Sequence, residues 1–191
     1  MKINNSSKKL NNKGFTLMEL IVVLAIMVVM AGAAAVTVTM LDSSYVEDAE
    51  RGIKDYVALG RTKSMSVAAK DWYVSVGKES GDYYVYLYKV VEESGSDKTY
   101  MVDKKKLGAK VSIAYKDAAD GLSIVIGEST NVQMHFDAAT GKIKSVFYDN
   151  NGDDANDWPG NSTAIGYFAI KRNDYGINLK VFFNTGKCER E

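Results

Sequence analysis

The feature that most constrains this chain is a long apolar run near its N-terminus, directly preceded by one acidic residue. Residues 20–41 contain no charged side chain, and Glu19 stands immediately before them. As an α-helix this run would extend roughly 33 Å, about the thickness of a bilayer core. A carboxylate inside such a helix costs on the order of 2–3 kcal/mol unless it is neutralised or paired. We therefore expect Glu19 to have a partner.

Three interpretations of this segment are open. It can be a single-pass membrane anchor with Glu19 at the interface, or a secretory signal peptide cut at the small residues 31–35. In the third interpretation the chain is cut between Gly14 and Phe15, and the apolar run is kept. This cut would create a cationic amine on Phe15, four residues before Glu19. The amine could pair with Glu19 of the same chain or of the next subunit, so only this interpretation explains the acid.

The residues around the proposed cut form a known motif. Lys13-Gly14 followed by Phe15-Thr16-Leu17-Met18-Glu19 resembles the prepilin cleavage and methylation signature of type IV pilins and type II secretion pseudopilins. The resemblance covers the chain from Lys13 to about Leu41. It implies cleavage after Gly14 by a prepilin peptidase, N-methylation of Phe15, and a role for Glu19 in subunit docking. The implied partners are other pilin or pseudopilin subunits in a homo- or hetero-oligomeric filament.

The distribution of charge predicts on which side of the membrane each end of the chain lies. The whole sequence has 24 basic and 24 acidic side chains, and its first 14 residues hold four lysines and no acid. A basic leader predicts that residues 1–14 are cytoplasmic and that the C-terminal part lies outside a single-pass cytoplasmic membrane protein. Removing the leader leaves 20 basic and 24 acidic side chains. This mildly acidic remainder gives no electrostatic reason to expect nucleic acid as a partner.

The apolar run continues into an amphipathic pattern. Apolar and small residues recur every three or four positions from Val46 to Val67, which predicts one buried helix face. Glu47–Arg51 and Glu50–Lys54 are spaced as ion pairs on its wetter side. We expect one helix over residues 15–69, of which residues 15–41 lie in the membrane or the filament core. Gly52 and Gly60 would weaken it by about 1 kcal/mol each, unless another segment crosses closely there.

After residue 70 the hydrophobic period changes to two, which predicts a β-rich head over residues 70–191. Turn signals rich in Gly, Asn, Asp and Ser separate the predicted strands. The fold class is therefore α+β, a long N-terminal helix packed on an antiparallel sheet or a small β-sandwich. The expected strands are residues 72–76, 83–91, 99–102, 110–115, 122–126, 132–136, 142–148, 164–171 and 177–183.

Two segments of the head resemble one particular class within this family. Residues 132–137 before Thr140-Gly141 resemble a strand–turn–strand of the GspH/FimT class of minor pseudopilins. Residues 177–183 followed by Asn184-Thr185-Gly186-Lys187 resemble the closing strand and turn of that class. This resemblance implies a minor rather than a major pilin.

Residues suited to catalysis are few. His135 is the only histidine, and no nucleophile motif accompanies it. Cys188 is the only cysteine, so it forms no disulfide within the chain and builds no zinc site with one histidine. We therefore expect a protein that is not an enzyme. Aromatic residues on both faces of one strand, at Tyr83, Tyr84, Tyr86 and Tyr88, suggest either core filling or a surface that stacks on sugars.

One polar stretch could bind a metal ion. Residues 149–157 are rich in Asp, Asn and Gly, which is the composition of a calcium loop and also of an ordinary solvated loop. The glycine position and the lack of a closing glutamate do not match an EF-hand. No other cofactor is expected. The candidate calcium ligands are Asp149, Asn151, Asp153 and Asp157.

The function that follows is mechanical. We expect a structural subunit of a type IV pilus or a type II secretion-like pseudopilus, most consistent with a minor pilin, that is stored in the membrane and then joins a filament through its helix. The alternatives are a major pilin, a pseudopilin of a DNA-uptake system, and a membrane-anchored extracellular binding module. A secreted soluble protein is a more remote alternative.

Overall fold

The computed structural model of the chain describes residues 15–117, 123–149 and 165–191. One helix, α1 (Leu17–Ser66), is followed by ten strands. The chain divides into two compact units, residues 1–39 and residues 40–191. The second unit is the head, and it contains the second half of α1 together with all the strands.

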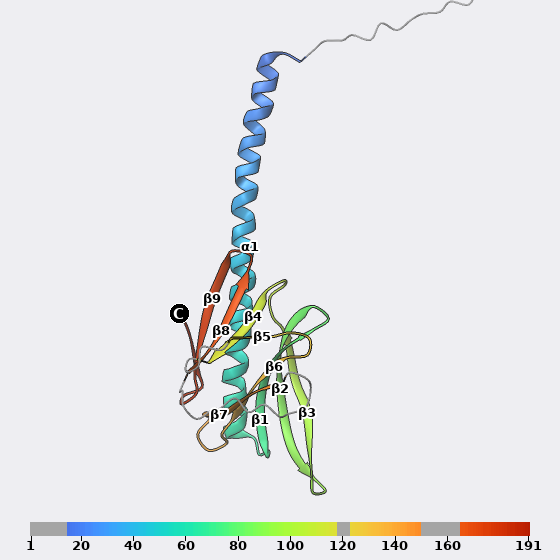
Figure 1. The fold of residues 1–191 in the computed structure, drawn as a ribbon, viewed down its shortest axis with the longest axis vertical. Coiled ribbons are helices and arrows are strands. Elements are labelled where there is room, and N and C mark those ends of the chain that lie inside the picture. The colour runs from blue at the N-terminus through green and yellow to red at the C-terminus, as the bar shows by residue number, and fades with distance from the viewer. Residues whose placement is uncertain (1–14, 118–122, 150–164) are drawn as a thin grey trace, which may run out of the picture. The chain divides into compact units, whose positions relative to one another are not determined.

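The strands of the head form two antiparallel five-stranded sheets (Figure 1). The first sheet has the order β3-β2-β1-β6-β7, and the second has the order β10-β9-β8-β4-β5. Most paired strands in each sheet are consecutive along the chain, whereas β1–β6 and β4–β8 join distant segments. The bounds are β1 (Asp71–Glu79), β2 (Asp82–Glu93), β3 (Ser96–Lys106), β4 (Ser112–Asp117), β5 (Ser123–Val125), β6 (Asn131–Phe136), β7 (Ile143–Asp149), β8 (Ile165–Arg172), β9 (Tyr175–Phe182) and β10 (Lys187–Arg190).

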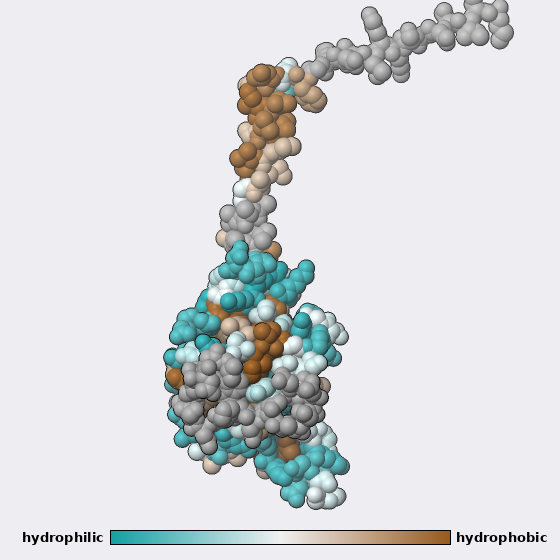
Figure 2. All heavy atoms as spheres, viewed as in Figure 1, coloured by the Kyte–Doolittle hydropathy of each residue, from teal (hydrophilic) through white to brown (hydrophobic). Residues whose placement is uncertain are grey.

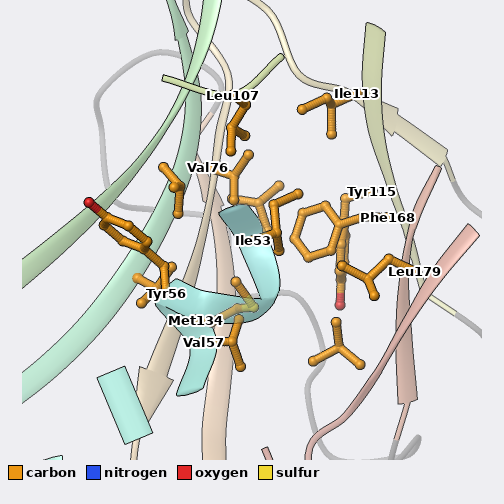
Figure 3. Packing of buried hydrophobic residues seen from close by; sticks show 14 of the residues in the cluster. Ile53, Tyr56, Val57, Val76, Leu107, Ile113, Tyr115, Met134, Phe168 and Leu179 are labelled. Carbon is orange, nitrogen blue, oxygen red and sulfur yellow. The ribbon is translucent and has the colours of Figure 1, made fainter. Parts of the chain in front are cut away.

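The two sheets and the helix share one hydrophobic core. Figure 3 shows Ile53 and Val57 of α1 between side chains of the two sheets. Val76 of β1 lies toward one side, and Phe168 of β8 and Leu179 of β9 lie toward the other. Ile53, Val57, Val76, Phe168 and Leu179 have no exposed surface. The helix is therefore built into the core of the head, and the predicted α+β class with a long N-terminal helix is confirmed.

The amphipathic pattern predicted the buried face of α1. The predicted positions on this face are all buried, namely Val46, Ala49, Ile53, Tyr56, Val57, Gly60 and Ser64. Val67, in contrast, lies beyond the helix end and is 37% exposed. Both predicted ion pairs form, with 3.5 Å between Arg51 Nη2 and Glu47 Oε2 and 2.5 Å between Lys54 Nζ and Glu50 Oε1.

The two helical glycines mark close approaches. A Cβ at position 52 would lie 2.5 Å from Cδ2 of Leu107. A Cβ at position 60 would lie 2.6 Å from Cε2 of Phe136 and 2.9 Å from Cγ2 of Val74. Glycine therefore lets other segments of the head cross the helix at these positions, which was the one condition under which the sequence could tolerate it.

The strand prediction was wrong at the C-terminus. The closing turn expected at residues 184–187 forms over residues 183–186, but the tenth strand, β10, was not expected; it begins at Lys187 and pairs antiparallel with β9. Three of its four residues are charged, so it has no alternation of apolar and polar positions. Its backbone pairing with β9, rather than burial of its own side chains, makes it a strand.

Candidate functional site

The start of α1 is held by a reciprocal cap between Thr16 and Glu19. The backbone N–H and the hydroxyl of Thr16 donate to Glu19 Oε2, at 2.8 and 2.9 Å. The backbone N–H of Glu19 donates in return to Thr16 Oγ1, at 3.2 Å. This is a capping box, in which the residue before the helix and the third helical residue satisfy each other's amide groups. Glu19 therefore has a partner within its own first turn.

This cap gives Glu19 a partner that the sequence-based interpretation did not include. The acid was explained only by a new amine on Phe15, yet Thr16 supplies hydrogen bonds to it whether or not the chain is cut. The signal was readable, because Thr-x-x-Glu before an apolar run is the capping-box pattern. Only Oε2 of Glu19 takes part, and within the described residues Oε1 accepts no hydrogen bond. The carboxylate thus keeps one oxygen available to a second partner.

The first turns of α1 expose apolar side chains on all sides. Phe15 is 86% exposed, Leu17 77% and Met30 68%, and the large apolar side chains between them are all at least 46% exposed. Figure 2 shows this apolar surface at the start of the helix, whereas most of the described head surface in the same view is hydrophilic. Apolar surface of this extent marks a site of interaction. No helical stretch in the described part of the chain combines the length and the hydropathy that crossing a bilayer requires.

A buried polar cluster ties α1 to the β8–β9 turn of the head. Asp42 is only 6% exposed and accepts hydrogen bonds from Arg172 Nε at 2.6 Å and Asn173 Nδ2 at 2.8 Å. Arg172 also donates to the carbonyl oxygen of Ala109, and its guanidinium lies 4.2 Å from the centre of the Tyr45 ring. The hydrogen bond from Asn173 lowers the pKa of Asp42, and Arg172 lowers it further, while partial burial opposes them.

His135 lies on the outer face of the first sheet, with His135 Nδ1 2.6 Å from Asp71 Oδ2. Lys144 Nζ lies 3.0 Å from the other carboxylate oxygen of Asp71. Burial would raise the pKa of Asp71, but the hydrogen bonds from His135 and Lys144 bring it below its usual value. These contacts give the only histidine a structural role in the sheet.

A row of rings crosses the same face. Tyr73 lies between Tyr88 and His135, with ring centroids 4.8 and 4.6 Å away and nearly parallel planes. Because Tyr88 and His135 are on the strands to either side of β1, both faces of Tyr73 are covered and no sugar can stack on them. Tyr83 points into the core instead, where its hydroxyl donates to the carbonyl oxygen of Ile126 at 2.9 Å. On β2, Tyr83 thus fills the core, whereas the rings of Tyr84, Tyr86 and Tyr88 follow one another along the outer face with centroids 6.1 and 5.9 Å apart.

The predicted metal ligands fall where the structure gives no side-chain detail. Asn151, Asp153 and Asp157 lie outside the described residues, and so does the side chain of Asp149. Among the residues that are described, no group of three or more His, Cys, Asp or Glu side chains could hold a metal ion. The calcium site stays a prediction, which a calcium titration followed by the melting temperature would test. Gly14, at the predicted cleavage point, also lies outside the described residues.

Cys188 is half-buried on β10, and burial raises the pKa of its thiol to about 12. A neutral thiol is a poor nucleophile.

Comparison with known proteins supports the N-terminal motif alone. The family model of the prokaryotic N-terminal methylation motif matches residues 9–35. No curated protein and no solved structure matches the chain. The motif supports a type IV pilin-like or pseudopilin subunit and so points to a structural role. It implies processing by a prepilin peptidase and assembly with other pilins, and it is consistent with a membrane-anchored pilus subunit.

Proposed function

We propose that the protein is a minor pilin or pseudopilin of a type IV pilus or a type II secretion-like filament. One observation carries the proposal: a methylation motif lies where a capped helix with an exposed apolar surface begins. The chain is cut between Gly14 and Phe15, and the new amine on Phe15 is methylated. The apolar helix over residues 15–41 then holds the subunit in the cytoplasmic membrane, with the head outside, until it joins the filament.

Glu19 sets the register between neighbouring helices in this proposal. Its Oε2 atom stays in the cap with Thr16, and its Oε1 atom accepts the amine on Phe15 of an adjacent subunit. A subunit that docks out of register would bury Glu19 without a partner, which is strongly unfavourable in apolar surroundings. Repetition of this head-to-tail contact gives an open filament.

The assignment to the minor class rests on the head. The β6–β7 hairpin carries a turn in which Thr140 donates to Asp137 and Gly141 has a φ of +66°. The β9–β10 turn has Gly186 with a φ of +61°. These are the two segments that resemble the GspH/FimT class, and both form turns between paired strands. This agreement supports the proposal of a minor subunit.

Intact-mass measurement of the membrane form tests the processing. The expected mass lacks residues 1–14 and includes one added methyl group. A form that retains Met1 would favour the plain anchor, and a new N-terminus near Val36 would favour the signal peptide. Either result would exclude the filament proposal.

Incorporation into filaments tests the role of Glu19. Glu19→Ala is expected to leave cleavage intact but to reduce the amount of the subunit in sheared filaments. Glu47→Ala is the matched control, because Glu47 is an acidic residue of the same helix that lies in the head and pairs with Arg51. Normal incorporation of Glu19→Ala would exclude the docking role. The abundance of the unsubstituted chain relative to other subunits in the same sample decides between a minor and a major pilin.

A further inference from the structure

Arg61 differs from the other three arginines of the chain, because each of the others has a partner. Arg51 pairs with Glu47, Arg172 with Asp42, and Arg190 with Glu47 and the hydroxyl of Tyr175. Arg61 makes no hydrogen bond or ion pair within the described residues, and its Nε atom is buried. An arginine stays protonated in proteins, so this N–H is a buried donor that has lost its water.

Two turns hold the Arg61 side chain in place. A Cβ at Gly141 would lie 2.8 Å from Cγ and 3.1 Å from Nε of Arg61, and one at Gly186 would lie 3.2 Å from Cδ. Both glycines have positive φ values, which lets their turns approach the side chain this closely. Long basic side chains usually pack their stem and leave their charged end in water. Packing of the stem therefore explains the direction of Arg61 but not its buried, unpaired Nε.

Arg61 lines a groove between α1 and β10 with a volume of about 560 Å³. The groove is also lined by Lys187 of β10 and by Lys54, Asp55 and Thr62 of α1. Lys54 is already paired with Glu50, and Asp55 lies 3.9 Å from Lys105. Within the described residues, Arg61 and Lys187 are thus the two cations of this groove without an ion pair.

One carboxylate opposes these cations. Glu189 also lines the groove, and within the part of the chain described here it has no ion-pair partner. The two unpaired cations exceed this single acid, so the groove keeps an excess of positive charge. A guanidinium binds carboxylate and phosphate oxygens through two parallel N–H donors, whereas an ammonium contributes a single point charge.

We propose that Arg61 and Lys187 form a binding site for one oxyanion, a carboxylate or a phosphate group. Its oxygens accept hydrogen bonds from the terminal N–H groups of Arg61, and Lys187 supplies the second charge. The oxyanion comes either from a free anion or from an acidic side chain of a second protein chain. The site does not depend on cleavage at Gly14, so it can be tested whether or not the proposed function is correct.

The test follows the side-chain Nε–Hε resonances of the full chain in detergent micelles by nuclear magnetic resonance. The chain has four arginines, so the spectrum is simple, and Arg61→Lys identifies the relevant signal. Addition of inorganic phosphate or acetate at constant ionic strength is expected to shift the Arg61 signal saturably. The signal of Arg51, an exposed arginine of the same helix, is the internal control.

Two variants sharpen this titration. Lys187→Gln is expected to weaken phosphate binding about tenfold, because it removes one charged contact. Glu189→Gln is expected to strengthen binding, because it removes the opposing carboxylate. An unchanged affinity in both variants would exclude the assigned groove.

Zero-length carbodiimide cross-linking of the assembled or self-associated protein distinguishes the two possible sources of the oxyanion, a free anion and an acidic side chain of a second chain. A cross-link from Lys187 to an Asp or Glu of a second chain, lost in Lys187→Gln, identifies an acidic side chain as the ligand. Saturable phosphate binding without this cross-link identifies a free anion. If the Arg61 signal responds to neither anion and Lys187 forms no cross-link, the proposal is wrong.

Discussion

At the scale of single residues, the first helical turn depends on one threonine. Thr16 supplies two donors to Glu19 Oε2 and accepts the amide of Glu19, so it orients the carboxylate as well as capping the helix. Replacing a threonine cap by a residue without a hydroxyl costs about 1 kcal/mol. Thr16 therefore has its effect by holding the Glu19 carboxylate in one orientation.

Thr16→Val is expected to increase amide hydrogen exchange in the first turn of α1 by about fivefold, which corresponds to about 1 kcal/mol. Thr16→Ser keeps the hydroxyl and is expected to retain protection. Thr37→Val is the matched control, because the Thr37 hydroxyl donates to the carbonyl oxygen of Ala33 inside the helix and caps nothing. Equal exchange in Thr16→Val and the unsubstituted chain would contradict the cap.

Gly60 gives the second prediction at this scale. Alanine is the better helix former by about 1 kcal/mol, but its Cβ would collide with Phe136 and Val74. Gly60→Ala is therefore expected to destabilise the head by about 1–3 kcal/mol in urea unfolding. Gly32→Ala is the control, because a Cβ at position 32 has no atom within 4 Å in the described structure. A gain in stability for Gly60→Ala would show that the sheet does not cross closely there.

At the scale of secondary-structure elements, the Asp42 cluster joins α1 to the β8–β9 turn. The folded pKa of Asp42 is lower than the usual value of 3.8. The carboxylate therefore stabilises the fold at pH above 3.8, and this contribution is lost as the pH falls through the lowered folded pKa.

Asp42→Asn is expected to lower Tm at pH 7 and to reduce the difference between Tm at pH 7 and at pH 3. Its amide offers one acceptor to Arg172 and Asn173 in place of two charged oxygens. Asp48→Asn, an exposed acid on the same helix, should leave both values nearly unchanged. If Tm depended on pH in the same way in Asp42→Asn and Asp48→Asn, the Asp42 cluster would not contribute to stability.

The stack of Tyr73 between Tyr88 and His135 gives a prediction for the first sheet. A double-mutant cycle with Tyr73→Thr and Tyr88→Thr is expected to give a coupling energy of about 0.5–1.5 kcal/mol in urea unfolding, because each single change removes the same ring contact. A cycle between Tyr73 and Tyr100, which does not stack with it, should be close to additive. Equal coupling in the two cycles would mean that stacking contributes nothing specific.

The elements differ in how far the sequence predicted them. The buried face of α1 was predictable because residues such as Ile53 and Val57 recur with the helical period. The alternation of inward Val74 and Val76 likewise identified β1. The charged strand β10 was not predictable, because only its pairing with β9 defines it. The sheet orders were not predictable either, because β1–β6 pairing is set by the whole core and leaves no local pattern.

In the candidate sites, too, local features were predictable from the sequence and contacts between distant segments were not. The motif at Phe15 and Glu19 is local, so all of its residues, including the Thr16–Glu19 cap, can be read from the sequence. The Arg61 groove depends on the approach of two turns, at Gly141 and Gly186, that are distant along the chain. No pattern of residues around Arg61 in the sequence indicates the groove.

At the scale of the whole molecule, the head has a core that does not use the first unit. Every buried apolar residue of the described chain lies between Val46 and Phe183, and the cluster around Asp42 also belongs to the head. The apolar side chains before residue 31 contribute nothing to this core, because they are exposed. The first unit is therefore available for contacts with other molecules.

A chain that begins at Met40 is accordingly expected to unfold cooperatively, with a Tm within about 3 °C of the head transition in the full chain, since about 3 °C corresponds to about 1 kcal/mol at this size. A chain that begins at Lys54 is the control. It lacks Val46, Ala49 and Ile53, whose loss removes several kcal/mol of buried packing, so it should not fold. Differential scanning calorimetry measures both. A chain from Met40 without a cooperative transition would mean that the head needs the apolar helix for its own stability, and the exposed surface of that helix could then not be assigned to contacts with other subunits alone.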